Sequence, residues 1–419
     1  MADLIVSHQK YLENLPLVFN YDSLKNEIIT KLNKEKLVVI SGLRGSPKTN
    51  IIGNIIQKSN YKNNYFYFNK QLDYNNEINS EKDLNSLFSS YTKRYKEPSI
   101  IILENTHNIK GFKDFLSKKY SEKKYKIIII GNDIKIGGKP KISISTPCIK
   151  QVKELIIDNF NLTDLLKFGS LEEIFLLKNN YLKTRYLELQ KSDTIYNDII
   201  TSYSLKNHDL YQYTLSYISL LKDYTSLREL NKSINNNIKL SLVTMIEYVD
   251  YSIEANIISK MQIYDLKLQK EITSKAKYFF SDLGIRNSLN GFNTSLYTLK
   301  ENLIYNELVK TGYEVNGGLN GKFEFSFIAK KTTNTDIKIK IDTVFIHISK
   351  QTKNEEVKKE VRKLLKIPFV PTKIDGKETE ETVYKYLIVE NIKELKLKKL
   401  QYENVRIIDF EEFVEKTLA

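Results

Sequence analysis

The sequence predicts an α/β protein in three parts: a doubly wound α/β domain, a helical middle that includes a winged helix, and a second α/β domain. Three observations support this. Short apolar runs alternate with helical patterns up to about residue 150. Glycine and proline nearly vanish from 150 to 290, where a 3.6-residue periodicity prevails, and strand patterns return after 290. A chain of 419 residues is long enough to bury several cores.

The first part has the pattern of strands that are buried on both faces of a parallel sheet. Its apolar runs are short, continuous and bounded by polar turns. They lie at 37–41, 64–68, 99–103 and 126–131, with helical patterns at about 21–33, 50–58, 82–94 and 111–120. In such a sheet, ligands are expected at the carboxyl ends of the strands.

The first apolar run leads into a near match to the phosphate-binding loop G-x-x-x-x-G-K-[ST]. Gly42, Lys48 and Thr49 fall on this pattern, Gly45 is a further glycine in the loop, and Pro47 replaces the second glycine. Backbone N–H groups of such a loop cradle phosphates, and the lysine reaches the outer ones. Proline has no N–H and fixes φ near about −65°, so Pro47 removes a donor and stiffens the turn. Bound ATP would contact Gly42, Gly45, Lys48 and Thr49, but we expect that binding to be weak or absent.

The middle part contains a candidate winged helix at 226–265, where a helix, a turn, a second helix and a β-like tail follow one another. The second helix is expected to begin near Lys239. Its inward-facing residues are expected to be Leu242, Val243, Ile246 and Val249.

Two interpretations of this winged helix stay open, contact with DNA and contact with protein. A DNA-reading helix presents Arg, Lys, Asn or Gln to base edges. The basic residues that favour DNA are Arg228, Lys232 and Lys239. The carboxylates that oppose phosphates are Glu247, Asp250 and Glu254.

The last part mixes helices and strands. A helix at 298–311 ends at Gly312, a usual C-terminal stop. Strands are expected at 323–329, 343–349, 383–389 and 405–408, with a charged helix at 353–365. The strands at 323–329 and 343–349 are expected side by side, flanked by the first helix.

Charge and cysteine content limit the function classes. The net charge is +14, and residues 1–150 hold 25 Lys and Arg against 14 Asp and Glu. Four lysines of the basic cluster, which suits a polyanion such as nucleic acid, are Lys118, Lys119, Lys123 and Lys124. The alternative is a solvated lysine-rich surface. A single cysteine, Cys148, excludes a disulfide framework, and no apolar run is long enough to span a membrane, so a cytoplasmic location is expected.

Several segments together resemble a family of prokaryotic ATPases with an AAA-like P-loop domain, a central winged helix and a C-terminal domain of restriction-endonuclease-like fold. The most specific is AKYFFSDLGIRNSL at 276–289, followed by ENLIYNELVKTGYEV at 301–315 and EEVKKEVRKLL at 355–365. The resemblance implies four regions: an AAA-like domain at 1–150, helices at 151–222, a winged helix at 223–290 and a nuclease-like domain at 291–419.

The resemblance also implies ATPase chemistry from which this chain departs. The strand at 99–103 should be followed by Asp-Glu, which serve Mg²⁺ and the attacking water. Here Glu104 and Asn105 follow, and an amide does not accept a proton at neutral pH. Asn132 or Asp133, after the next strand, would fill a polar sensor position, unless it is only a turn residue. Because both the phosphate loop and the residues after the strand at 99–103 are altered, we predict that ATP hydrolysis is lost or nearly lost.

The implied nuclease site is altered in the same way. Such a site needs carboxylates and a lysine around a divalent metal ion. Glu301 and Glu324 are present, but Ser326 stands where an aspartate is common and His347 lies on the following strand. We predict no metal there and no nuclease activity.

The sequence therefore favours a degenerate P-loop ATPase-like protein that serves as an interaction scaffold, with a protein partner or self-assembly. Two alternatives stay open. One is a slow Mg-dependent ATPase in which Lys48 contacts phosphates, Thr49 the Mg²⁺ and Glu104 the metal-bound water. The other is a nucleic-acid-binding protein that uses the basic cluster and the winged helix.

Overall fold

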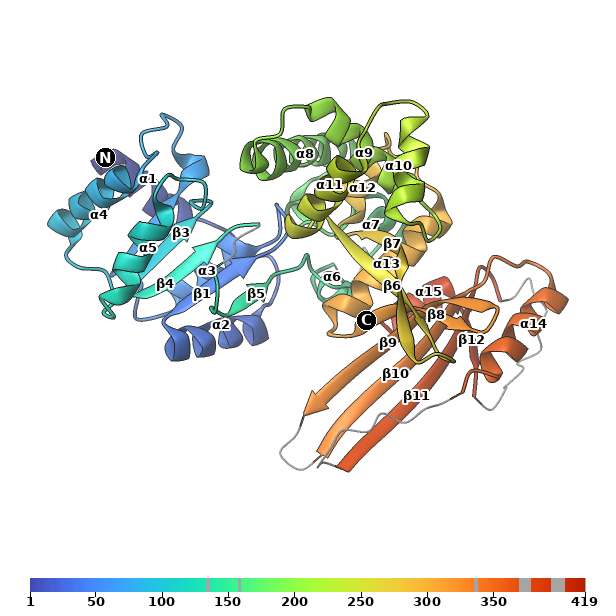
Figure 1. The fold of residues 1–419 in the computed structure, drawn as a ribbon. Coiled ribbons are helices and arrows are strands. Elements are labelled where there is room, and N and C mark those ends of the chain that lie inside the picture. The colour runs from blue at the N-terminus through green and yellow to red at the C-terminus, as the bar shows by residue number, and fades with distance from the viewer. Residues whose placement is uncertain (133–135, 157–159, 335–337, 369–377, 393–403, 419) are drawn as a thin grey trace.

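The computed structural model describes residues 1–419 except 133–135, 157–159, 335–337, 369–377, 393–403 and 419. The N-terminal α/β domain lies at one end of the molecule. A group of helices follows it, and a large sheet lies beyond them (Figure 1). The structure therefore has the three kinds of region that the sequence predicted, in the same order: an α/β sheet, a helical middle part and a second sheet.

The N-terminal domain contains a parallel five-stranded sheet in the order β2-β3-β4-β1-β5. The strands are β1 (Leu37–Ser41), β2 (Tyr65–Asn69), β3 (Ile100–Glu104), β4 (Lys126–Ile130) and β5 (Lys141–Ser143). The first four confirm the predicted runs to within one residue at each end. The predictions did not include β5, whose three residues are too short to give an apolar run.

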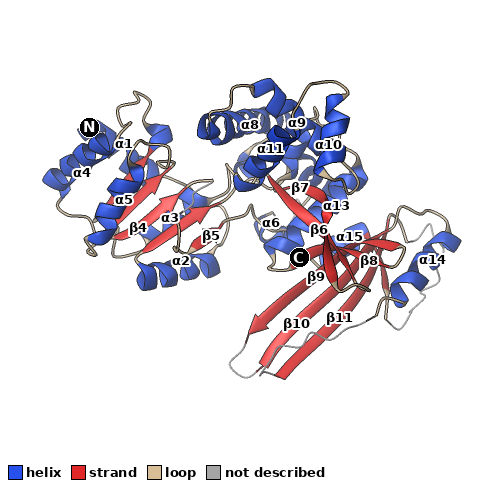
Figure 2. Ribbon diagram, viewed as in Figure 1, coloured by secondary structure: helices blue, strands red, loops and turns tan. Residues whose placement is uncertain are grey.

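Helices cover both faces of this sheet (Figure 2). They are α1 (Ala2–Glu13), α2 (Asp22–Glu35), α3 (Lys48–Gln57), α4 (Glu81–Tyr95) and α5 (Phe112–Ser121), with a short 3-10 turn η1 (Lys70–Leu72). Side chains alternate along β1, so that Leu37 and Val39 pack with α4 and α5 while Val38 and Ile40 pack with α2 and α3. Burial on both faces explains why the strands are apolar throughout.

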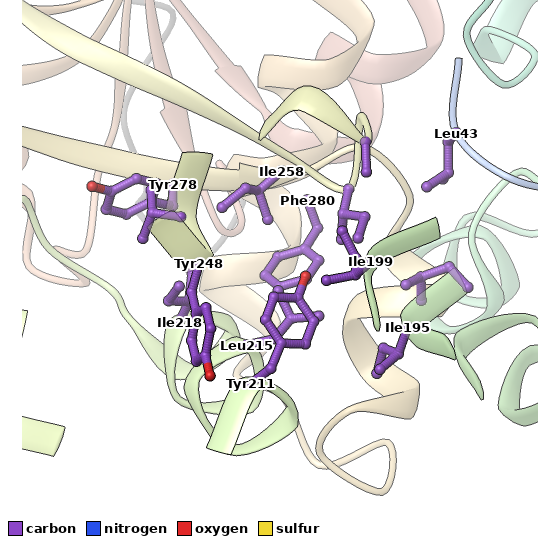
Figure 3. Close-up of a cluster of buried hydrophobic side chains, with 14 of the residues drawn as sticks. Leu43, Ile195, Ile199, Tyr211, Leu215, Ile218, Tyr248, Ile258, Tyr278 and Phe280 are labelled. Carbon is purple, nitrogen blue, oxygen red and sulfur yellow. The ribbon is translucent and has the colours of Figure 1, made fainter. Parts of the chain in front are cut away.

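Helices dominate the middle part, as the 3.6-residue periodicity predicted. They are α6 (Ile149–Leu155), α7 (Leu162–Phe168), η2 (Glu172–Leu176), α8 (Asn180–Asp193), the π-helix η3 (Thr194–Thr201), α9 (His208–Leu220), α10 (Leu227–Asn235), α11 (Leu242–Glu254) and α12 (Leu283–Ser288). One buried cluster unites most of them and includes Tyr211, Leu215 and Phe280 (Figure 3). Leu43, from the N-terminal domain, belongs to the same cluster.

The predicted inward face of the second helix in the winged-helix candidate was wrong at Val243 and Ile246. Helix α11 begins at Leu242, because the Ser241 hydroxyl caps it by accepting the N–H of Thr244. Val243 is 66% exposed and Ile246 37% exposed, whereas Val249, also predicted to face inward, is buried together with Met245 and Tyr248. Apolar residues occur on two faces of this helix, so periodicity alone did not separate its buried positions from its exposed ones.

The C-terminal sheet has seven strands in the order β12-β11-β10-β9-β8-β6-β7. They are β6 (Ile258–Asp265), β7 (Lys270–Phe280), β8 (Glu314–Asn320), β9 (Phe323–Asn334), β10 (Lys338–Ile348), β11 (Glu378–Val389) and β12 (Arg406–Asp409). Because β6 pairs with β8, the hairpin assigned to the winged helix is continuous with the C-terminal sheet.

Three helices accompany this sheet: α13 (Leu296–Lys310), α14 (Asn354–Leu365) and α15 (Phe410–Lys416). Strands β9 and β10 are antiparallel neighbours, with Phe345 opposite Ile328. Helices α13 and α15 share one apolar cluster with the sheet and α14 shares another. The predicted pair of adjacent strands flanked by the first helix is therefore confirmed.

Among the residues placed by the structure, no helix is both long and apolar enough to cross a membrane.

Candidate nucleotide-binding site

The candidate phosphate loop lies where the sequence predicted it, between the carboxyl end of β1 and the start of α3. Gly42 is required at its position, because a Cβ there would lie 2.1 Å from the carbonyl oxygen of Ile144. Gly45 has a φ of 79°, which favours glycine. Pro47 is the N-cap of α3 with a φ of −75°, a value that proline adopts without strain. The loop therefore accommodates its proline.

The Lys48 side chain is turned into its own loop. Its Nζ donates hydrogen bonds to the carbonyl oxygens of Gly42 (3.0 Å) and Leu43 (2.7 Å) and to the Ser46 hydroxyl (3.2 Å). The residue is only 6% exposed. Burial lowers the pKa of Lys48 to about 8, although nearby carboxylates favour its charged form. The ammonium group that would reach a phosphate is thus engaged by protein oxygens.

Thr49 and Glu104 meet at the end of the sheet. The Thr49 hydroxyl donates to Glu104 Oε1 at 2.6 Å, and the Tyr67 hydroxyl donates to Glu104 Oε2 at 2.6 Å. Burial raises the pKa of Glu104, and these two hydrogen bonds together with Lys48 lower it. The loop hydroxyl and the strand-end carboxylate are therefore in direct contact in the structure.

Some backbone donors of the loop remain available for a ligand. The N–H groups of Gly45, Thr49 and Asn50 have no acceptor among the residues that the structure describes. Ser46 donates to the Leu43 carbonyl and Lys48 donates to the Ser46 carbonyl. A helix N-terminus with free N–H groups suits an anion.

The helical middle part covers this loop. Leu43 inserts into the buried cluster of that region, near Ile195 and Ile199 (Figure 3). A Cβ on Gly45 would lie 3.2 Å from Leu171 and 3.4 Å from the Gln190 side chain, so these groups stand directly over the loop. Side chains of the helical part therefore contact the loop at Leu43 and Gly45.

An ion pair connects the phosphate loop to the helical middle part. Arg44, inside the loop, donates from Nε to Asp198 of η3 at 2.8 Å and makes a second, very short contact through Nη2. Its Nη1 donates to Gln71 at 2.9 Å. Both side chains of the pair are largely buried, so the bidentate contact is shielded from solvent.

The two polar residues predicted after β3 and β4, Asn105 and Asn132, make different contacts. Asn105 has a φ of 53°, and its amide donates to the side chain of Asn69 at 3.2 Å. It also lines a cleft of about 340 Å³ that continues to Asp198. Asn132 is buried, and its backbone oxygen accepts a hydrogen bond from Asn256 at 2.9 Å. Asp133, the alternative sensor residue, lies outside the described residues.

The predicted basic cluster lies at the end of α5 and in the loop that follows it. Lys118 pairs with Glu81 at 2.6 Å, Lys119 with Glu122 at 3.0 Å, and Lys124 with both Glu122 and Glu97. The backbone oxygen of Lys123 accepts a hydrogen bond from Lys36. Carboxylates therefore neutralise part of the positive charge. Lys239 is exposed in the turn before α11 and lies far along the chain from this cluster.

If this cluster contacts phosphates, it should retain duplex DNA at about 50 mM salt and release it by about 200 mM, because each neutralised phosphate releases counterions. Replacing Lys118, Lys119, Lys123 and Lys124 with alanine should weaken retention alike for all DNA sequences in a mobility-shift assay. The matched control removes the same charge from scattered exposed lysines: Lys62, Lys353, Lys359 and Lys416. No retarded DNA at about 50 mM salt would exclude the role.

The C-terminal candidates Glu301, Glu324, Ser326 and His347 line one cavity. They come from α13, β9 and β10, so the pairing of β9 with β10 brings them together as the sequence predicted.

Sequence reasoning missed three residues of the nucleotide site, Arg44, Tyr67 and Asp198. The sequence position of the first two could have indicated them, because Arg44 lies inside the loop motif and Tyr67 lies on a strand parallel to the one that ends in Glu104. The position of Asp198 could not, because it comes from a π-helix more than 150 residues away along the chain.

Comparison with known proteins identifies the class of the N-terminal domain. Residues 34–140 match the family described as AAA domain. The parallel sheet, the loop and the Thr49–Glu104 contact lie within or next to the matched residues, so the similarity to the AAA family concerns the N-terminal domain.

More distant similarity extends along the chain. A protein of Methanocaldococcus jannaschii with uncharacterized function is 22% identical over 342 residues, covering 75% of this chain and 76% of its own length. An uncharacterized protein of Haemophilus influenzae is 22% identical over 358 residues, covering 79% and 85%. Among solved structures, a Walker-type ATPase of Pyrococcus abyssi has a TM-score of 0.47 and 12% identity, covering 67% of this chain and 99% of its own.

Proposed function

We propose that this protein is a degenerate member of the P-loop ATPase class, with weak or absent ATP binding and hydrolysis, that acts as an interaction scaffold. The observation that carries the proposal is that protein groups already contact the phosphate loop and its lysine. Lys48 is bonded to its own loop, and the helical part contacts that loop at Leu43, at Gly45 through Leu171, and at Arg44 through Asp198. A nucleotide would have to displace all of these contacts.

The residue that would polarise an attacking water also supports this proposal. Asn105 follows Glu104 at the end of β3, and its amide is hydrogen-bonded to Asn69. An amide does not take up a proton at neutral pH, so it does not replace a general base. Loss of a general base commonly costs about 10²–10⁴ in rate.

The scaffold role is supported by the exposed face of α11. It presents Val243 and Ile246 beside the acidic residues Glu247 and Asp250, all of them exposed. Apolar side chains bordered by charge are typical of protein interfaces, and the carboxylates oppose DNA phosphates. We therefore assign protein contact, in preference to DNA reading, to this helix.

A slow Mg-dependent ATPase is the second candidate, and one observation favours it. The Thr49 hydroxyl lies 2.6 Å from Glu104 Oε1. In the same loop, the N–H groups of Gly45 and Thr49 have no acceptor among the described residues. These residues fit Mg-ATP: Thr49 and Glu104 would hold Mg²⁺, and Lys48 would contact phosphates. The bound metal would neutralise phosphate charge.

Calorimetry with MgATP tests the proposal. We expect the unmodified chain to show no binding at submicromolar concentrations, because the cradle is covered and lacks the donor at Pro47. The P47G variant should bind more tightly than the unmodified chain if the rest of the site is intact, whereas P47G/K48A should not. Submicromolar binding of MgATP by the unmodified chain would contradict the degenerate assignment and favour the ATPase.

A further inference from the structure

The C-terminal domain contains a second polar site, which is independent of the nucleotide loop. It is a cavity of about 180 Å³ bordered by β7, β9, β10, α13 and α14. Its charged lining residues include four carboxylates, two cations and a histidine. The six that matter here are Asp223, Lys277, Glu301, Glu324, His347 and Glu360.

Carboxylate oxygens gathered around a small cavity are the ligands that divalent cations prefer. The side chains of this cavity nevertheless do not fit a metal ion. Nowhere in the described part of the chain do three or more His, Cys, Asp or Glu side chains have the arrangement that holds one.

Glu301 is engaged by a lysine. The Nζ atom of Lys277 lies 2.7 Å from Oε1 and 2.7 Å from Oε2 of Glu301, and Glu301 is 3% exposed. Two neighbouring candidate ligands, Ser326 and His347, also contact protein groups. The Ser326 hydroxyl accepts the N–H of Ile348 at 3.0 Å, and His347 Nε2 lies 3.4 Å from Glu360. Glu301, Ser326 and His347 thus each have a protein partner, while Asp223 and Glu324 line the same cavity.

We infer that Lys277 is the resident cation of this cavity: its ammonium group neutralises Glu301 in the place that a divalent cation would otherwise take. The cavity is then a latent cation site, which is closed as long as this ammonium group is present. Lys277 is fixed from two sides, because its chain lies on β7 and its Nζ faces the rings of Tyr224 and Phe279 at 5.8 and 5.9 Å.

The electrostatics of the neighbouring carboxylate agree with this inference. Burial raises the pKa of Glu324, the Lys277 ammonium lowers it, and the carboxylates of Asp223 and Glu301 raise it. Glu324, Asp223 and Glu301 are therefore close enough to repel one another, and Lys277 counters that repulsion more strongly than Lys350, the second lysine of the lining. Without this lysine, three carboxylates would face a cavity with room for a hydrated cation.

Manganese binding, measured by electron paramagnetic resonance and calorimetry on the full chain, tests the inference. We expect the unmodified chain to bind no Mn²⁺ at this cavity. The K277M variant should bind one Mn²⁺ with a dissociation constant on the order of 10⁻⁴–10⁻³ M, the range of weak oxygen-ligand sites. The K277M/E324Q variant should lose most of that binding.

The matched control is K310M. Lys310 and Glu307 form another buried ion pair on the same helix, 3.0 Å apart, but outside this cavity. K310M should therefore leave a buried carboxylate without creating Mn²⁺ binding. Binding by K310M equal to that of K277M would show that any orphaned carboxylate suffices, and would overturn the inference.

A stability measurement covers the case in which K277M folds poorly. K277M leaves Glu301 buried without a counter-ion, so its melting temperature should fall, and K277M/E301Q should recover part of the loss. Added Mn²⁺ should raise the melting temperature of K277M and leave that of K277M/E301Q unchanged. Mn²⁺ binding by the unmodified chain that E324Q abolishes, or a folded K277M without Mn²⁺ binding, would overturn the inference.

Discussion

Replacing Arg286 with methionine is expected to lower the free energy of unfolding by about 3 kcal/mol. Arg286 is 1% exposed, and its guanidinium donates to the backbone oxygens of Ser219 and Leu221 and to the amide oxygen of Asn302. Burial lowers its pKa to about 10, so removing the charge recovers some desolvation free energy. The oxygens left without donors cost more, because they stay buried.

Urea unfolding followed by circular dichroism measures this effect. R286K should restore little, because a single ammonium group does not reproduce the planar fork of the guanidinium. R185M is the control, since the Arg185 side chain is 64% exposed and pairs only with Glu188 on its own helix; it should change stability by less than about 0.5 kcal/mol. An R286M protein as stable as the R185M control would contradict the assignment.

Arg286 belongs to a segment that connects the helical middle part with α13 of the C-terminal part. Asp282 accepts the N–H groups of Ser170 and Ile285, and Asn287 donates to the backbone oxygens of Leu166 and Lys167. A Cβ on Gly284 would lie 2.2 Å from the carbonyl oxygen of Phe168. The residues at 276–289, the most specific segment in the sequence, therefore include α12 and form a largely buried connector between α7, α9 and α13.

The second large effect is expected at the ion pair that covers the phosphate loop. R44M should destabilise the protein by about 3–5 kcal/mol, because it leaves the Asp198 carboxylate buried without its partner. The variant should also expose the segment around η3 to limited proteolysis, since this pair fastens the helical part over the loop.

The double variant R44M/D198L separates the pair from the packing around it. Replacing both charges with apolar side chains removes the desolvation cost, so this variant should be close to the unmodified protein in stability. Equal destabilisation by R44M and R44M/D198L would mean that the arginine acts through packing alone. Near-neutral results for both would mean that the helical part does not cover the loop in solution.

The sequence by itself determined the N-terminal sheet, because strands buried on both faces are continuously apolar and leave a periodic signal. It also determined the loop that ends β1, since Gly42, Lys48 and Thr49 occur at fixed spacing. The adjacency of Glu324 and His347 followed from alternation along two strands expected to pair. All of these are local patterns, which survive in a single chain without knowledge of its neighbours.

Only the tertiary structure decided what covers these sites. Nothing near Asp198 in the sequence indicates that it meets Arg44, and nothing near Lys277 indicates that it neutralises Glu301. The exposed side of α11 was equally undetermined, since Val243 and Met245 are both apolar and only packing buries one of them. Contacts between distant segments depend on how the parts dock, and docking is set by the whole buried surface, which no local pattern records.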